Sequence, residues 1–449
     1  MTGMTSRSSQ PEGRSDGGHD IHGLLDRFAR LGATPGGGIT RLCASPADGE
    51  ARDLFAALLG EAGAIVTTDG VGNQFGRFPL AGVEGAPLVM AGSHLDSQMR
   101  AGRLDGTLGV VAALEVGRTL MGRKRDGAPF DADFCAVNWT NEEGARFRPS
   151  LLGSGAYAGH HDAAFALSRR DDDGVSLGDA LEAIEYRGRD AAPAVPACYL
   201  ELHVEQGSVL EEEGATIGVV ARNWGALKVE AVFEGEQAHT GPTRMDRRRD
   251  ALLAAAHAIT AARALADRWP GRLHTSVGRL LVEPNSPNVV PARVALSLEV
   301  RSADDAVLAE AGRFADALLA TAAAEAGVGL TIATRSERPI RSLPQAVGDL
   351  VSFCAETSGH RTLRMDTVAG HDALSLLGRC PLGLIFVPSV GGVAHNEREA
   401  THAADLDAGR DVLLDAADRL CRAGGSPERA TRSPGSAPER TERRPGSAP

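Results

Sequence analysis

The chain has 449 residues, of which 43% are hydrophobic and 24% charged, and its formal net charge is −12 at pH 7. This length exceeds what one hydrophobic core usually supports, so we expect two domains with the composition of an ordinary globular protein. The acidic balance, without a basic patch interleaved with aromatic residues, argues against nucleic acid as a partner. No apolar run is long enough to predict a membrane span, so we expect no membrane partner either.

The cysteines and the two ends of the chain indicate the compartment. The six cysteines are scattered without a CxxC pair, which is typical of a reducing cytoplasm. Residues 1–20 lack the apolar core of a secretory signal, and we expect them to form a disordered leader. Residues 423–449 are rich in Pro, Ser, Gly, Arg and Glu, and we expect them to form a disordered tail.

The first half of the chain alternates predicted helices and strands. Hydrophobic periodicity predicts helices over 21–31, 45–63 and 107–121, and strands over 65–68, 72–77, 88–90, 133–139 and 199–205. Several of these strands are short continuous apolar runs, which are typical of strands buried in a parallel sheet. This part of the chain is therefore predicted to form an α/β domain.

A different order of elements follows. The predicted elements are a strand over 226–233, a helix over 248–268, strands over 273–282 and 292–301, a helix over 304–326 and a strand over 328–333. This βαββαβ order is typical of a small ferredoxin-like domain. After it, a short strand over 384–387 lies between two further helices. We therefore predict a small domain, 219–337, inserted into a discontinuous larger domain, 21–218 and 338–422, with linkers near 218–224 and 334–342.

Polar residues that follow the predicted strands are the candidates for chemistry. They are His94, Asp105, Glu142, Glu143, His203 and His395. In open α/β sheets ligands bind beyond the carboxyl ends of the strands, and imidazole and carboxylate groups suit zinc and similar divalent ions. Asp105 alone could be a helix cap and His94 a surface residue. The whole set favours a hydrolytic centre in which one carboxylate bridges two ions.

The motifs around these residues resemble the successive motifs of a metal-dependent amidohydrolase family. They read GSHLDSQMRAGRLDGTLGV, WTNEEGARFRPSLLGSGAYAG, ELHVEQG, AHTGPTRMDRRRDAL, PNSPNVVPARVALSLEVRS, GHDA and PSVGGVAHNEREAT. The family contains N-carbamoyl-L-amino acid hydrolases, β-ureidopropionases and allantoate amidohydrolases, and it is related to aminoacylases and carboxypeptidase-like dinuclear peptidases. The resemblance implies an aminopeptidase-like dinuclear-zinc catalytic domain with an inserted ferredoxin-like lid and dimerisation domain.

The resemblance implies a role for each candidate at the metal centre. Two divalent ions per subunit are implied, zinc or else manganese, cobalt or nickel. One ion would be held by His94, Asp105 and His203. The other would be held by Asp105, Glu143 and His395, with Asp105 bridging the two. Glu142 would be the general base, which takes a proton from the attacking water and delivers it to the leaving nitrogen.

The resemblance also implies contacts with a substrate that bears a carboxylate. The implied contacts are Gln206 for the ureido group, Asn288 and Arg301 for the carboxylate, and the backbone N–H groups of Gly391 and Gly392. His239 resembles the residue that polarises the scissile carbonyl. It stands beside Gly241 and Pro242 and could instead shape a turn, just as Arg301 could be a solvated charge. In the family His239 and Asn288 reach the active site of the partner subunit, so a homodimer through the small domain is implied.

Some residues depart from the family's pattern or fall outside its metal set. Arg244 in GPTRM replaces the usual proline, which predicts an altered loop or a substrate with additional negative charge. Arg100 is a further departure without an assigned role. His371 is interpreted as lying behind the ligands or on the substrate side. The adjacent histidines at 160 and 161 are not assigned to the metal centre, because neighbouring side chains of a strand point apart.

The sequence therefore predicts a cytoplasmic hydrolase of linear C–N bonds other than peptide bonds. The expected reaction converts an N-carbamoyl-L-amino acid, or N-carbamoyl-β-alanine, to the amino acid, CO2 and ammonia. The alternatives within enzymes are an allantoate amidohydrolase and an aminoacylase or dipeptidase. The alternative of a different class is a non-catalytic amino-acid-binding protein on the same fold, which the complete ligand set disfavours.

Overall fold

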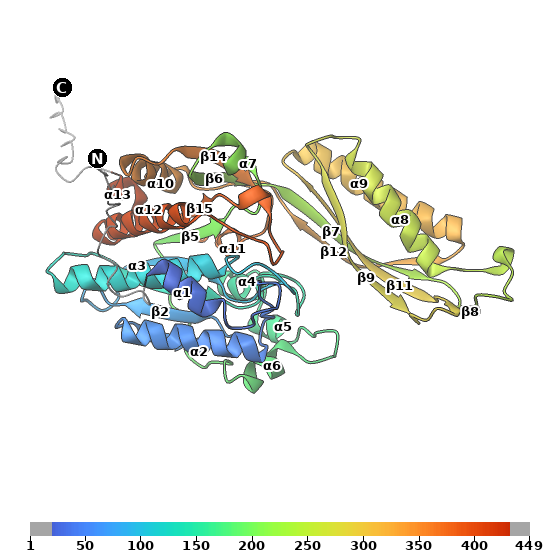
Figure 1. The fold of residues 1–449 in the computed structure, drawn as a ribbon, viewed down its shortest axis with the longest axis horizontal. Coiled ribbons are helices and arrows are strands. Elements are labelled where there is room, and N and C mark those ends of the chain that lie inside the picture. The colour runs from blue at the N-terminus through green and yellow to red at the C-terminus, as the bar shows by residue number, and fades with distance from the viewer. Residues whose placement is uncertain (1–19, 432–449) are drawn as a thin grey trace, which may run out of the picture. The chain divides into compact units, whose positions relative to one another are not determined.

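The computed structural model describes residues 20–431, and these divide into two compact units (Figure 1). The larger unit contains residues 20–219, 344–364 and 371–431, and the smaller unit contains residues 220–343 and 365–370. Most of the predicted leader and the predicted tail from residue 432 onward lie outside the described residues. Within residues 20–431 no helix is long and apolar enough to cross a membrane.

The larger unit is built on a mixed sheet with a parallel centre. Its strands are β1 (Ile65–Thr68), β2 (Gln74–Phe78), β3 (Leu88–His94), β4 (Asp133–Trp139), β5 (Cys198–Val204), β6 (Ile217–Asn223) and β15 (Leu382–Val387), in the order β1-β2-β4-β3-β5-β15-β6. Strands β4, β3, β5 and β15 run parallel to one another. Every residue of β4, β5 and β15 is buried, which explains why β15 is a continuous apolar run and why the other two strands are largely apolar.

Helices cover this sheet and complete its core. They are α1 (Ile21–Phe28), α2 (Pro46–Glu61), α3 (Thr107–Arg125), α4 (Leu152–Ala158), α5 (Ala163–Leu167), α6 (Leu177–Ala183), α7 (Val209–Glu213), α10 (Gln345–Thr357), α11 (Asp372–Ser375), α12 (Ala403–Arg422) and α13 (Pro427–Ala430). Apolar residues of α1, α2, α3, α10 and α12 share one hydrophobic core with the strands. Helices α5 and α6 are too short to show a hydrophobic period in the sequence, so they were not predicted.

The start of the predicted tail is ordered, contrary to expectation. Residues 423–431 contain α13, whose first residue is Pro427. The Ser426 hydroxyl caps the helix by accepting a hydrogen bond from the Arg429 backbone N–H. Pro427 and Ala430 are buried, and Ala430 belongs to the main core. Composition concealed this short helix because the residues around it are those of a polar, proline-rich segment.

The smaller unit has the βαββαβ order expected from the sequence. Its main elements are β7 (Gly225–Glu234), α8 (Ala251–Ala266), β9 (His274–Glu283), β11 (Arg293–Ser302), α9 (Asp305–Ala326) and β12 (Gly329–Arg338). The four strands pair antiparallel in the order β12-β7-β11-β9. Both helices lie on one face of this sheet (Figure 1), where alanines, leucines and valines form a separate core. Between the main strands lie β8 (Ala238–His239), the 3-10 helix η1 (Met245–Arg247) and β10 (Val289–Val290).

The predicted linkers are strands. Residues 218–224 belong largely to β6, which runs from one unit into the other, and residues 334–342 contain the end of β12 and β13 (Arg341–Ser342). Strand β14 (Thr362–Thr367) pairs with β6, and residues 365–370 belong to the smaller unit. The chain passes between the units at residues 219/220 and 343/344, within or directly beside the predicted linkers, but these segments are paired strands.

The guanidinium of Arg41 is fully buried in the larger unit and joins several segments. It donates to the carbonyls of Phe28 and Leu31 at 2.9 and 3.1 Å, to the carbonyl of Leu95 at 2.6 Å, and to the hydroxyl of Thr107 at 2.7 Å. Burial lowers its pKa to about 10, so it stays charged at neutral pH. Arg41 thereby ties the end of α1 to the segment after His94 and to the start of α3.

Replacing Arg41 by Ala should destabilise the larger unit by about 3 kcal/mol or more. The substitution removes four hydrogen bonds. The carbonyls of Leu31 and Leu95 lose the donor that Arg41 supplies, and each such group costs roughly 1–3 kcal/mol. The unfolding midpoint in urea, followed by circular dichroism, measures the effect, and the exposed Arg30→Ala is the matched control. A midpoint of R41A equal to that of R30A would contradict this role.

Candidate metal centre

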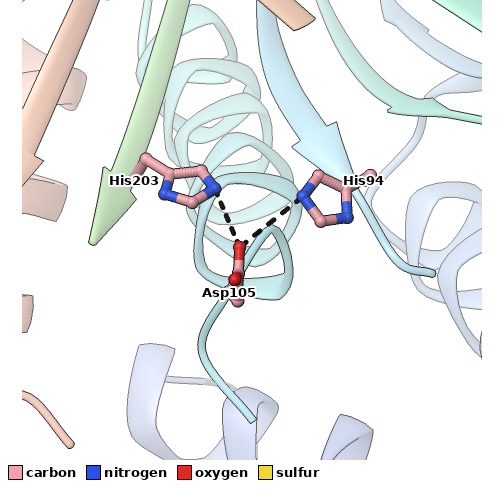
Figure 2. Close-up of side chains that lie close together, drawn as sticks. All are labelled: His94, Asp105 and His203. Atoms are coloured by element: carbon pink, nitrogen blue, oxygen red, sulfur yellow. Dashed lines mark ion pairs between the residues drawn. The ribbon is translucent and has the colours of Figure 1, made fainter. Parts of the chain in front are cut away.

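The strand ends of the larger unit bring the predicted ligands together. His94 is the last residue of β3, and His203 lies near the end of β5. The Glu142–Glu143 pair follows β4, and His395 follows β15. Asp105 lies in the loop that leads into α3, between the ends of β3 and β5 (Figure 2). Because the four strands are parallel neighbours, their carboxyl ends place these side chains at one edge of the sheet.

The carboxylate of Asp105 lies at the middle of this group. Its Oδ1 is 3.2 Å from His203 Nε2 and 3.7 Å from His94 Nε2 (Figure 2). Its Oδ2 is 3.2 Å from His395 Nε2. Burial alone would raise the pKa of Asp105, but the hydrogen bonds with His203 and His395 outweigh it and hold the pKa well below its usual range. The two oxygens thus face different imidazoles, as expected of a carboxylate that bridges two ions.

Glycine is required directly after Asp105. Gly106 has a φ of +66°, and a Cβ at this position would lie 2.3 Å from the ring of His94. The ring of His94 therefore packs directly against the backbone at the start of α3. This close approach sets the distance between the end of β3 and Asp105.

The imidazoles of His94 and His203 are oriented by backbone carbonyls. His94 Nδ1 lies 2.7 Å from the carbonyl of Asp96, and His203 Nδ1 lies 2.9 Å from the carbonyl of Val204. A carbonyl only accepts, so each Nδ1 carries the hydrogen and each Nε2 is directed at Asp105. Burial lowers the pKa of His94 to about 4, which keeps it neutral. For His203 the hydrogen bond with Asp105 outweighs burial and raises the pKa to about 9, so a bound ion would have to displace this proton.

A second ligand group surrounds the other oxygen of Asp105. His395 Nε2 lies 3.5 Å from Glu143 Oε2, which also accepts a hydrogen bond of 2.9 Å from Gln98 Nε2. Glu143 Oε1 is buried and has no hydrogen-bond partner among the described residues. Ligand atoms of Asp105, Glu143 and His395 all lie within 4.8 Å of one another, as do those of His94, Asp105 and His203. The two groups share Asp105.

A third group in this region supports His203 and does not resemble an ion site. Glu201, His203 and His371 also lie close enough to form such a group. The oxygens of Glu201, however, accept hydrogen bonds from the Ser93 hydroxyl at 2.8 Å and the Ala373 N–H at 2.7 Å. The His371 ring packs edge-on against His203 with centroids 4.7 Å apart. These residues therefore fill the space behind His203.

The charges of the region fit bound cations. Seven buried carboxylates belong to it, namely Asp96, Asp105, Glu142, Glu143, Glu201, Asp372 and Glu399. Burial raises the pKa of Asp96 to about 7, of Glu143 to about 8 and of Glu399 to about 7. Buried carboxylates are costly unless cations compensate them. The donor set, the shared Asp105 and the unpartnered oxygen of Glu143 together fit divalent ions.

Glu142 lies beside the centre but belongs to none of the three groups. Its Oε2 is 3.6 Å from His94 Nε2. Burial, followed by the negative charges of Asp372, Glu143 and Asp105, raises the pKa of Glu142 well above its usual range. A carboxylate next to the ligands yet outside them is placed to exchange protons with a molecule bound at the centre.

Asp96 fixes the backbone of the adjacent glutamates, and it was not predicted. Its Oδ1 accepts from the Glu142 N–H at 3.1 Å, and its Oδ2 accepts from the Glu143 N–H at 3.3 Å. The signal in the sequence is an acidic residue two positions after His94, in the segment that follows a predicted strand. Its role depends on the return of β4 to the same edge of the sheet, which the sequence does not show.

The predicted substrate contacts of the larger unit already have protein partners. Gln206 Nε2 donates to Asp105 Oδ2 at 2.8 Å, and Gln206 Oε1 is buried without a partner among the described residues. The Gly391 N–H donates to Glu211 Oε2 at 2.8 Å, and the Gly392 N–H donates to the Ser389 carbonyl at 3.0 Å. A substrate carboxylate would have to displace Glu211 to reach Gly391. The three residues nevertheless all follow β5 and β15, beside the ligands.

In the smaller unit, strand pairing brings two predicted substrate residues together. His239 in β8 lies opposite Val289 in β10, and the Thr240 N–H donates to the carbonyl of Asn288 at 3.2 Å. His239 and Asn288 are both exposed, and His239 Nδ1 accepts from the Gly241 N–H at 3.0 Å. This hydrogen bond belongs to the turn that the alternative interpretation of His239 predicts. It involves only the Nδ1 atom of the ring.

Arg301 is partly buried on β11 of the smaller unit and has two partners there. Its guanidinium donates to Glu299 Oε2 at 2.9 Å and to the carbonyl of Val368 at 2.8 Å. These contacts hold the side chain in place near the end of β11. Part of the guanidinium's hydrogen-bonding capacity is thereby used within the protein.

The two unexpected arginines are also paired. Arg244 donates to both carboxylate oxygens of Asp246, at 2.9 and 3.1 Å, and Arg100 donates to Glu397 Oε2 at 2.8 Å. Each charge is therefore balanced by a neighbour, which weakens the expectation of a substrate with additional negative charge. The histidines at 160 and 161 bond to the carbonyls of Ser375 and Leu152, as expected of structural residues.

Comparison with known proteins identifies the family. The model of the peptidase family M20/M25/M40 matches residues 90–419. The chain belongs to this family. The match confirms the resemblance of the motifs. It covers all six polar residues that were predicted from the strand ends. Hydrolases of the M20 family are typically metal-dependent, in agreement with the ligand groups around Asp105.

Individual M20 relatives match over nearly their whole length. The N-carbamoyl-L-amino-acid amidohydrolase of Rhizobium meliloti is 37% identical over 402 residues, which cover 87% of this chain and 94% of that protein. The allantoate amidohydrolase of Bacillus subtilis is 32% identical over 405 residues, which cover 88% of this chain and 96% of that protein. The crystal structure of an amidase of the hydantoinase/carbamoylase family from Burkholderia vietnamiensis has a TM-score of 0.85 at 37% identity, covering 90% of this chain and 97% of that one.

Proposed function

We propose that this M20 protein is a metal-dependent amidohydrolase that acts on an N-carbamoyl-L-amino acid or on N-carbamoyl-β-alanine. The observation that carries the proposal is the pair of ligand groups that share Asp105, with Glu142 beside both and part of neither. The similarity to the enzyme of Rhizobium meliloti supports the substrate class. The products would be the amino acid, CO2 and ammonia.

The residues present would hold two divalent ions. His94, Asp105 and His203 would hold one, and Asp105, Glu143 and His395 would hold the other. When bound, the ions would polarise the substrate carbonyl and lower the pKa of the attacking water. The nitrogen and oxygen ligands suit zinc and equally manganese, cobalt or nickel.

The proton transfers would be performed by Glu142. Its carboxylate takes a proton from the water whose oxygen attacks the ureido carbon. As the bond from this carbon to nitrogen breaks, Glu142 returns the proton to the leaving nitrogen. Asp96 holds the backbone of Glu142 throughout, so the carboxylate needs little reorientation between the two transfers.

The smaller unit would supply the remaining contacts as a lid and dimerisation domain. His239 would stabilise the negative charge that develops on the carbonyl oxygen. Asn288 and Arg301 would bind the substrate carboxylate, for which the planar guanidinium is suited. A homodimer through the smaller unit would bring His239 and Asn288 to the active site of the partner subunit. We propose a cytoplasmic location, which suits six free, buried cysteines.

A substrate panel tests this proposal. Purified protein loaded separately with zinc and with manganese is assayed for kcat/KM on N-carbamoyl-L-amino acids, N-carbamoyl-β-alanine, allantoate, N-acetyl amino acids and dipeptides. We expect the highest value on an N-carbamoyl substrate. Allantoate is the second candidate because of the relative from Bacillus subtilis, and a higher value on allantoate would replace our assignment with it. Tight amino-acid binding without turnover would show a binding protein instead.

Substitution of Glu211 tests the assignment of Gly391. Because Glu211 occupies the Gly391 N–H, Glu211→Ala should lower KM for carboxylate-bearing substrates by about threefold, in line with the modest net free energy of one hydrogen bond. We expect kcat to change less than KM. The matched control is Glu212→Ala, which removes the same charge from a neighbour that accepts from Ser208. Equal KM values for E211A and E212A would count against a carboxylate site at Gly391.

A further inference from the structure

The segment that carries His395 is fastened to the rest of the larger unit by two glutamates. Glu397 accepts from the hydroxyl of Thr34 at 2.5 Å and from Arg100 at 2.8 Å. Glu399 accepts from two backbone N–H groups, those of Leu104 at 2.9 Å and Asp105 at 3.1 Å. The first glutamate therefore holds the segment at the surface. The second holds it to the backbone of the shared candidate ligand.

Glu399 is built closely into its place. Its side chain is buried, with 6% of the residue exposed. A Cβ at Gly102 would lie 2.1 Å from the Glu399 Cδ, so the loop that leads to Asp105 passes directly over this carboxylate. Substitution of this glycine would force the loop and the carboxylate apart. The contact thus couples the loop of Asp105 to the segment of His395.

His395 itself needs this support. Its φ is +49°, in the left-handed region that residues other than glycine adopt only when the surrounding structure holds them there. The Glu399 contacts, which reach the backbone of Asp105 itself, lie on the C-terminal side of His395. They oppose the relaxation that would carry the imidazole away from Asp105 and Glu143.

We propose that Glu399 is a positioning residue that sets Asp105 and His395 at the separation needed to hold the ions. The inference rests on the proposed function, since it concerns the proposed ligands. Glu399 acts through hydrogen bonding: a single oxygen, Oε1, accepts both N–H groups, and Oε2 has no hydrogen-bond partner among the described residues. A glutamine can therefore replace Glu399 with both bonds kept. An aspartate, which is one methylene shorter, cannot reach them.

Zinc affinity of four variants tests the inference. The dissociation constant is measured by competition with a chromogenic chelator, and the unfolding midpoint of the metal-free protein is measured in parallel. We expect Glu399→Ala and Glu399→Asp to weaken zinc binding by about 10–100-fold, the usual effect of removing a partner of a metal ligand. Glu399→Gln should stay within about threefold of the wild type. Glu397→Ala, the matched control in the same segment, should stay in the same range.

Each outcome decides the inference. It is supported if E399A and E399D lose affinity, E399Q and E397A keep it, and the metal-free midpoints agree. It is overturned if E399A and E399D bind zinc as the wild type does, or if E399Q or E397A loses as much as they do. If E399A and E399D lowered the stability of the metal-free protein as much as they weakened zinc binding, the role of Glu399 would be purely structural and the inference would be overturned. Failure of the wild type to bind zinc would instead refute the proposed metal set, which separates the two claims.

Discussion

Replacing Glu142 by Gln is expected to lower kcat on N-carbamoyl substrates by about 10²–10⁴-fold, the usual contribution of a general acid–base group. The amide keeps the shape of the side chain but cannot take the proton of the attacking water. Glu142 belongs to none of the candidate ligand groups, so the content of bound metal should not change. Steady-state kinetics, together with metal analysis of the dialysed protein, measures both effects.

The neighbouring carboxylate provides the matched control. Glu143→Gln alters a candidate ligand and should lower the metal content along with the activity. The two variants therefore differ in metal content although the substitutions are chemically identical and adjacent. Full activity of E142Q would show that Glu142 is not the base, and loss of metal from E142Q would make it a ligand.

Replacing Asp105 by Ala should have the largest effect on metal binding, because both ligand groups lose their shared member. We expect the content to fall from about two ions per chain to fewer than one, with loss of turnover. The variant also removes the carboxylate that faces His94, His203 and His395. Metal analysis after dialysis against a fixed concentration of free zinc measures the loss.

A substitution at one group only completes this test. His395→Ala removes a ligand of the group that contains Glu143 and leaves the group of His94 and His203 intact. About one ion per chain should remain in this variant. If D105A and H395A retained the same amount of metal, Asp105 would not be the shared ligand.

The order of the main elements could be predicted because buried strands and long helices have clear hydrophobic patterns in the sequence. Strands β4, β5 and β15 are buried along their whole length, so β15 is a continuous apolar run and the other two are largely apolar. Helix α9 in the smaller unit is long enough to show its hydrophobic period. Elements with weaker patterns were missed: β6 was taken for a linker, and the short helix α13 was taken for a disordered tail.

The hydrogen bonds that hold the candidate site in place could not be predicted from hydrophobic patterns. Asp96 and Glu399 act on backbone N–H groups that lie far away along the chain or on another strand end. Arg100 stood out as an unexpected charge, yet its partner Glu397 is distant in the sequence. Such contacts depend on the path of the loops between the strands, and no local hydrophobic pattern predicts that path.

By itself the sequence determined which residue types follow the strands, and through its motifs it determined the family. The motifs implied how these residues divide around Asp105, and only the tertiary structure decided which atoms face one another. It directs His94 and His203 at one carboxylate oxygen and His395 at the other. It also places Glu142 outside the ligand groups and Glu143 inside one of them. The physical reason is that a strand end fixes where a side chain starts, whereas its direction is set by contacts with backbone groups from distant parts of the chain.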